Sequence, residues 1–110
     1  MRSYLLLLLA AFAALYGCGP DLAHGTPACI EDVISGYDPP CDSGAKVDEY
    51  RFKSSTVYVF YPGGCGADLA SEVRNAACER IGVLGGISGN TKIADAEFST
   101  AVFVRTVWSN

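Results

Sequence analysis

The hydrophobic pattern opens with an apolar run from Tyr4 to Leu15, which Arg2 precedes and Cys18 closely follows. The run is too short to cross the ~30 Å hydrocarbon core of a bilayer comfortably. A basic start, a short apolar middle and small residues near the end are typical of a secretory signal. We therefore predict a signal peptide over residues 1–17 and leave it out of the fold.

The next periodic stretch predicts one short helix over residues 28–35. Thr26 is a good N-cap, Pro27 suits the first helical position, and Gly36 is a natural C-terminal cap. A helix of about eight residues is not stable alone, so its apolar face has to be buried. By the i, i+3, i+4 rule that face consists of Cys29, Ile30, Val33 and Ile34.

The clearest β pattern predicts strands over residues 46–52 and 55–62, joined by Lys53-Ser54. As a two-residue hairpin loop, this pair places Phe52 opposite Ser55 and Tyr50 opposite Val57. Lys-Ser is a weaker turn than Asn-Gly, so the register depends on the side-chain pattern. We expect one face to be the core face and the other, which carries Glu49 and Arg51, to be exposed or at an edge. The predicted core face comprises Tyr50, Phe52, Val57, Val59 and Tyr61.

The C-terminal half contains one ambiguous segment and one clear strand. Residues 68–81 have a helical apolar stripe with Asp68 as N-cap, while a turn at Asn75-Ala76 would make them strand–turn–strand. Residues 85–90 predict an irregular loop. Residues 99–108 are rich in β-branched residues and alternate, with apolar residues on both faces, which predicts a central strand. The two predicted faces are Thr100, Val102, Val104, Thr106 and Trp108 against Ala101, Phe103 and Val107.

These elements predict a single α+β domain over residues 28–110. A small antiparallel sheet, made of a hairpin, a meander and a C-terminal strand, would carry one short N-terminal helix. About 80 ordered residues give a marginal core, so disulfides would have to contribute to its stability.

The number of cysteines supports this scheme and also indicates a lipid attached to one of them, because the odd count of five becomes an even four once Cys18 carries lipid. The segment Leu15-Tyr16-Gly17-Cys18 is interpreted as a lipoprotein processing site, with Tyr16 larger than the usual residue there. Residues 18–27 would then be a lipidated N-terminus and tether, with Gly19 slightly favouring an outer membrane. Ordinary cleavage after Ala13 or Ala14 is the alternative, and it leaves an odd thiol. The remaining cysteines can form two disulfides in an oxidising compartment. They are Cys29, Cys41, Cys65 and Cys78, and local pairing (29 with 41, 65 with 78) is one of three possibilities.

Charge and candidate chemistry point away from catalysis. Without Arg2, seven basic residues face twelve acidic ones, and no Lys or Arg cluster favours nucleic acid. His24, the only histidine, lies in the tether, where no partner can position it as a catalytic base or metal ligand. The cysteine spacings do not fit a zinc site, and the acids near Asp38 and Asp42 do not fit a calcium loop. We therefore predict a non-enzyme with no metal and no cofactor.

The predicted function is that of a bacterial envelope protein, exported and lipid-anchored to the cell membrane or the outer membrane. Its expected partners are the membrane, through the lipid, and an envelope or host protein. The candidate binding loop is Tyr61, Pro62, Gly63 and Gly64. A peptidase inhibitor that presents this rigid, disulfide-flanked loop is one alternative. A small hydrolase, which would need clustered acids in a cleft, is another.

The order of these motifs resembles a family of small bacterial envelope lipoproteins classed only as a domain of unknown function. The similar features are the Cys29-Ile30 helix, the hairpin VDEYRF-KS-STVYVFYP, the Cys65 turn, the loop at residues 85–89 and a last strand ending near Trp108. The resemblance spans residues 28–108 and implies strand–turn–strand over residues 72–84. This chain has Lys53-Ser54 where the family has Asn-Gly, and Cys41 is extra, so no disulfide pairing carries over. The resemblance implies no activity.

Overall fold

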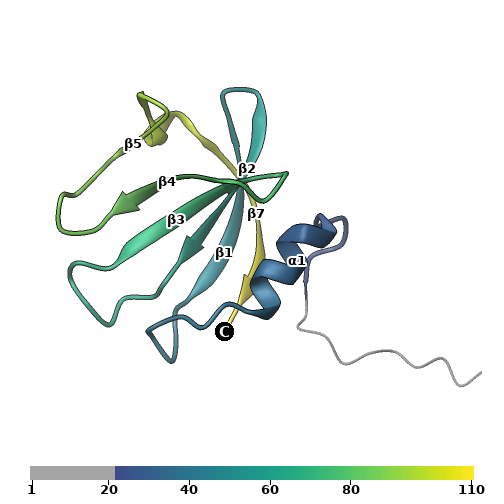
Figure 1. The fold of residues 1–110 in the computed structure, drawn as a ribbon, viewed down its shortest axis with the longest axis horizontal. Helices are drawn as coiled ribbons and strands as arrows, with labels where there is room; N and C mark the ends of the chain where they lie inside the picture. The colour runs from purple at the N-terminus through teal and green to yellow at the C-terminus, as the bar shows by residue number, and fades with distance from the viewer. Residues whose placement is uncertain (1–21) are drawn as a thin grey trace, which may run out of the picture.

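The structure is a computed structural model that describes residues 22–110. Five strands form one antiparallel sheet in the order β4-β3-β2-β1-β7, and β5 and β6 form a separate two-stranded ribbon (Figure 1). This arrangement confirms the predicted α+β fold. No helix among the described residues is long and apolar enough to span a membrane. The elements are α1 (Ala28–Ser35), β1 (Lys46–Phe52), β2 (Ser55–Tyr61), β3 (Ala70–Asn75), β4 (Arg80–Gly85), β5 (Lys92–Ile93), β6 (Ala96–Glu97), the 3₁₀ turn η1 (Phe98–Thr100) and β7 (Val102–Ser109).

The β1–β2 hairpin has the predicted register. Phe52 pairs with Ser55 and Tyr50 with Val57. Lys53 and Ser54 both adopt positive φ angles, 49° and 63°. A turn with two positive φ values matches the right-handed twist of the flanking strands, so the pair forms a tight turn despite its unfavourable sequence.

Residues 68–81 are strand–turn–strand, and the helical interpretation of this segment is wrong. Val73 pairs with Val59 of β2 and is fully buried. The turn after β3 is held by the Asn75 side chain, whose Oδ1 accepts hydrogen bonds from the amides of Ala77 and Glu79, both at 3.0 Å. Pairing with β2 therefore outweighs the local helical pattern.

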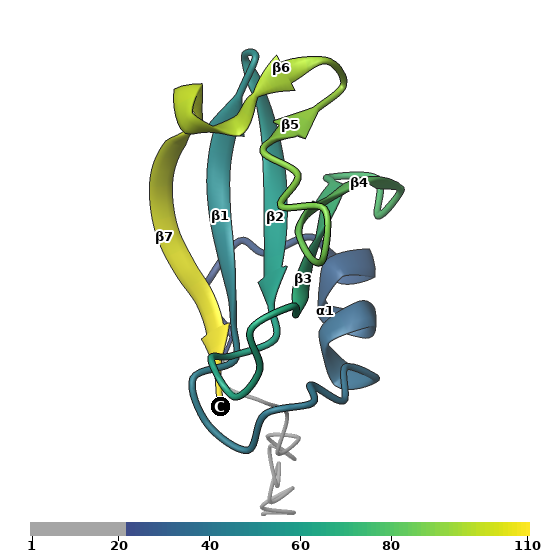
Figure 2. The same cartoon turned by 90° about the vertical axis from the view of Figure 1, so that its left-hand side faces the viewer.

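Both faces of the hairpin are buried, which corrects the expectation of a single core face. On one face α1 covers the sheet through Ile30 and Ile34, and Tyr58 and Phe60 lie beneath it. On the other face Ile93 of β5 caps the predicted core residues of the hairpin. Figure 2 shows α1 beside the lower half of the sheet and the β5–β6 ribbon at the upper end. The face that was expected to be exposed is buried because α1 covers it.

Helix α1 has the predicted bounds, but its N-cap residue is not the predicted one. Pro27 is the N-cap residue and makes no side-chain capping bond. Thr26, predicted as the N-cap, instead donates its hydroxyl to the carbonyl of Ala23 at 2.7 Å. The helix therefore depends on burial of Ile30 and Ile34 and on a disulfide for its stability.

Two disulfides link distant parts of the chain, and the local pairing does not form. Cys29 of α1 bonds to Cys78 in the β3–β4 turn, and Cys41 bonds to Cys65. Neighbours in space, not in sequence, decide the pairing, because α1 packs across the sheet toward β3. The Cys29–Cys78 bond thereby fastens the short helix to the sheet.

The last strand lies at the edge of the sheet, where a central position was predicted. It pairs only with β1 in the sheet order, and it begins at Val102 because Phe98–Thr100 form the turn η1. Register shifts fall opposite Val47/Asp48 and Glu49/Tyr50, so residues in β7 are skipped there and the predicted alternation breaks. Val107 is buried in the cluster under α1, with Trp108 beside it. Phe103, predicted to share a face with Val107, contacts Tyr50 instead.

Candidate functional site

The predicted lipid site, Cys18, lies outside the described residues. Of the predicted tether, residues 18–27, the structure describes residues 22–27. The backbone carbonyl of His24 accepts a hydrogen bond from Arg105 Nη1 at 2.6 Å, and its side chain is exposed. Among residues 22–110 no group of three or more His, Cys, Asp or Glu side chains is arranged to hold a metal ion.

The candidate binding loop, Tyr61 to Gly64, is packed into the domain for most of its length. Pro62 is buried, and Tyr61 is half-buried. Gly63 has φ +102°, and a Cβ there would lie 2.5 Å from the Cβ of Cys41. Only Gly64 of the four is exposed, and it has no side chain to offer. The loop is packed against Cys41 and presents no side chain that would fill a pocket on a partner.

A polar cluster lies on the sheet near this loop. Asp48 is 1 % exposed, and its carboxylate pairs with Lys46 Nζ at 3.0 Å and accepts a hydrogen bond from Thr106 Oγ1 at 2.8 Å. The hydroxyls of Tyr50 and Tyr61 share a hydrogen bond of 2.8 Å. Asp48, Tyr50 and Tyr61 therefore each have a polar partner within this cluster, as buried polar groups require.

Tyr61, one of the two tyrosines of this cluster, is held in its protonated form. Burial raises the pKa of Tyr61 far above its ordinary value, and the hydrogen bond with Tyr50 and the nearby Asp48 charge raise it further. A tyrosine with a raised pKa is a poorer general base at neutral pH than an ordinary one. The geometry therefore gives Tyr61 a role in holding β1 to β2.

The most exposed group of apolar side chains on a strand lies at the start of β7. We call Val102, Phe103 and Val104 the β7 edge patch; these side chains are 65, 54 and 44 % exposed. Further along the strand, the N-terminal segment covers the edge, because the Ala23 amide donates to the Val107 carbonyl at 3.1 Å. An uncovered edge strand with apolar side chains is a template for pairing with another chain.

The opposite edge of the sheet is better protected. The side chain of Asn90 folds back over β4 and donates to the carbonyl of Val83 at 2.6 Å, and Gly85 and Asn90 form a backbone bridge. Among the described strands of the sheet, the first half of β7 is therefore the more open edge.

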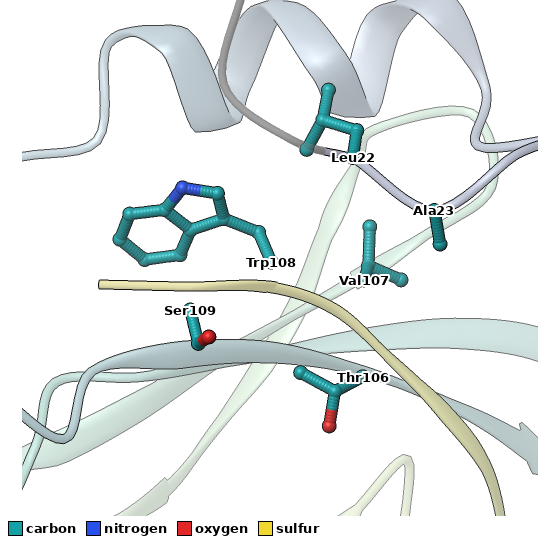
Figure 3. A pocket seen from close by; sticks show the side chains of 6 residues that line it. All are labelled: Leu22, Ala23, Thr106, Val107, Trp108 and Ser109. Atoms are coloured by element: carbon teal, nitrogen blue, oxygen red, sulfur yellow. The ribbon is translucent and has the colours of Figure 1, made fainter.

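A hollow of about 430 Å³ lies at the other end of β7 (Figure 3). Leu22 and Ala23 border it on one side, and the end of β7 from Thr106 to Ser109 borders it on the other. The Trp108 ring lies beside it and packs against Tyr37, with ring centroids 5.8 Å apart. The hollow and the β7 edge patch are thus at opposite ends of one edge strand.

The match to known families covers most of this structure. Residues 37–110 match the domain of unknown function DUF6970. The chain belongs to this family. The match confirms the domain of unknown function expected from the motifs, and it begins after α1. The Cys29–Cys78 disulfide therefore joins the DUF6970 domain to a helix that precedes it. No curated protein and no solved structure matches the chain.

The sequence reasoning missed the β7 edge patch, although the signal was present. Apolar residues on both faces of a strand were interpreted as a central strand. The same pattern also fits an edge strand whose apolar residues remain uncovered. Only the order in which the strands pair in the sheet, and not the composition of the DUF6970 segment, distinguishes a central strand from an edge strand here.

Proposed function

We propose that this DUF6970 protein is a non-catalytic binding or structural module of a bacterial cell envelope, held at the membrane by a lipid on Cys18. The observation that carries the proposal is the pairing of all four cysteines within residues 22–110. Disulfides of this kind persist in oxidising, exported compartments. The fifth cysteine, Cys18, then remains for lipid attachment after an apolar signal.

The module would act through contact surfaces. The buried carboxylate of Asp48 pairs with the Lys46 ammonium and accepts a hydrogen bond from the Thr106 hydroxyl, and the raised pKa of Tyr61 keeps that tyrosine protonated. These groups are bonded to one another and are not directed at a ligand. The β7 edge patch supports binding because it offers apolar side chains and an unpaired strand edge together.

A peptidase inhibitor finds less support from the loop. An inhibitory loop has to present a side chain to the protease, and the exposed part of the candidate loop is Gly64, next to the disulfide at Cys65.

The experiment that tests the proposal is intact-mass spectrometry of the full chain extracted from the membranes of a bacterial host. The expected product begins at Cys18 and carries acyl chains, with no titratable thiol elsewhere. The matched control is Cys18→Ser, which should abolish the acylated species. A water-soluble product that begins upstream of residue 18 contradicts the proposal.

A further inference from the structure

We propose that the end of the domain around the hollow beside Trp108 docks on the bilayer surface, with Trp108 and Leu22 at the level of the lipid headgroups. The surface that it fits is one of zwitterionic phospholipid. The inference rests on the proposed lipid on Cys18 and deepens that function by naming the face of the domain that meets the membrane.

Covalent geometry limits how far this end can lie from the lipid. Cys18 precedes Leu22 by four residues. At ~3.6 Å per extended residue, Leu22 lies no more than ~14 Å from a lipidated Cys18. The headgroup layer on each side of the hydrocarbon core is itself ~5–8 Å thick. Leu22 therefore stays within ~6–9 Å of the outer boundary of the headgroups.

The fold brings the only tryptophan to the same place. The Ala23 amide donates to the Val107 carbonyl at 3.1 Å, which fixes the start of the described chain beside the end of β7. Leu22 borders the hollow on one side and Trp108 on the other (Figure 3). Both side chains pack against the cluster under α1, and both are only partly buried. The amphipathic ring of tryptophan favours the headgroup level of a bilayer, so its position beside the anchor suits this contact.

The charges at this end decide which lipid it fits. The loop of residues 36–45 lies against the end of β7, where the Asn110 side chain donates to a loop carbonyl at 3.1 Å. Its exposed charges are Asp38 and Asp42, and it contains no Lys or Arg. Lys46, which follows the loop, is paired with a buried carboxylate at 3.0 Å. Anionic lipid recruits clusters of basic residues, so the surface that fits this end is zwitterionic.

The other end of the sheet is held away from the membrane. Strand β1 begins at Lys46, which pairs with Ser109, and ends at Phe52, which pairs with Ser55 at the hairpin tip. Six residues at ~3.3 Å each place the tip ~20 Å along the strands from Ser109. Figure 2 shows the C-terminus and the hairpin tip at opposite ends of the sheet. The β7 edge patch begins at the same end as the tip, because Val102 pairs with Arg51, and is therefore directed outward.

The test uses the full chain, purified from bacterial membranes with its lipid and placed in vesicles of phosphatidylcholine brominated near the headgroup end of the acyl chains. Bromine quenches tryptophan fluorescence at close range, and Trp108 is the only tryptophan. Its emission should fall relative to the same vesicles without bromine. The matched control, Trp108→Phe/Ser55→Trp, carries its single tryptophan at the hairpin tip and should show no loss of emission.

A charge at the docking face provides the second arm. Leu22→Glu should lower the ratio of docked to undocked protein at least ~10-fold, because a charge replaces an apolar side chain that leaves water on docking. Val102→Glu, at the outer end of β7, should leave the quenching of Trp108 unchanged. Non-reducing mass analysis must show both disulfides in each variant, and Ser109→Glu replaces Leu22→Glu if that variant does not fold.

Each outcome decides the inference. No loss of Trp108 emission, equal loss from positions 108 and 55, or a loss that appears only after anionic lipid is added overturns it. Quenching that the charge at the docking face leaves unchanged also overturns it. The mass of the same preparation reports acylation of Cys18 separately. An acylated chain without quenching sinks the docking alone, whereas a chain without acyl groups sinks the proposed anchor and the docking with it.

Discussion

Removal of the Cys29–Cys78 disulfide by the double substitution Cys29→Ser/Cys78→Ser is expected to destabilise the domain strongly. This bond joins α1 to the β3–β4 turn, and an eight-residue helix is not stable without support from the rest of the fold. Burial of Ile30 and Ile34 remains in the variant, so the helix loses its covalent attachment and keeps its packing.

The size of the effect follows from the nesting of the two disulfides. Cys29 and Cys78 are 49 residues apart, and Cys41 and Cys65 lie between them, 24 residues apart. The Cys41–Cys65 bond already joins two points within the Cys29–Cys78 loop. The loop that the Cys29–Cys78 bond still has to close is therefore shorter by 24 residues and has about 25. In the chain-entropy model, closing such a loop contributes about 3.5 kcal/mol. Small domains are stable by about 5–15 kcal/mol, so the loss is a large fraction of the total.

Urea unfolding followed by the fluorescence of Trp108 is a suitable assay. Trp108 is the only tryptophan and packs against the cluster under α1, so its emission reports the region that the disulfide holds. With a slope of about 1 kcal/mol per molar urea, the midpoint should fall by about 3–4 M. Asp42→Ser, at an exposed position, is the control and should leave the midpoint unchanged.

Two results would refute this reasoning. One is a double-serine variant that unfolds within about 1 M urea of the parent protein while the other disulfide remains intact. The other is peptide mapping of the parent protein that finds Cys29 bonded to Cys41.

Three further predictions use the same unfolding assay. Gly63→Ala should lower the free energy of unfolding by about 1–3 kcal/mol, because the φ of Gly63 is +102° and a Cβ there would lie 2.9 Å from the Ser43 carbonyl oxygen. In the control Gly64→Ala, the new Cβ meets nothing within 4 Å, so this variant should be nearly neutral. Equal effects of the two substitutions would contradict the packing of this loop. Asp48→Ala should cost about 1–3 kcal/mol, since it leaves the Thr106 hydroxyl without its acceptor, and a neutral result would mean that the buried ion pair contributes nothing. Burial raises the folded-state pKa of Tyr61 above its ordinary 10.0, so its contribution to stability is fully present below pH 10 and is lost as the pH rises further. Tyr61→Phe should therefore flatten the fall in the free energy of unfolding between about pH 9 and 11. An unchanged slope of stability against pH would refute the raised pKa of Tyr61.

Local patterns in the sequence were sufficient for α1 and the β1–β2 hairpin. The bounds of the helix and its buried face followed from the spacing of Ile30 and Ile34. The hairpin register followed from the alternation around Lys53-Ser54, because a two-residue loop permits only one pairing of its flanking strands. In both elements the deciding contacts lie within a few residues of one another.

The β5–β6 ribbon went unrecognised, because its two strands have two residues each and give no periodic signal. Its importance is visible only in three dimensions. Ile93 is 1 % exposed and fills the space above β4, where a Cβ on Gly82 would lie 2.6 Å from its Cδ1. Pairing between remote segments places this side chain in the core.

The sequence alone was sufficient to predict a cysteine-paired α+β domain, since periodicity, parity and composition are properties of the chain itself, and the export of this domain stays a prediction. The tertiary structure decided which cysteines pair, that residues 70–85 form two strands, and that β7 is an edge. These outcomes depend on which segments meet across the sheet. The apolar residues of β7 would look the same in the sequence of a central strand, and only the absence of a neighbouring strand in the described sheet exposes Phe103.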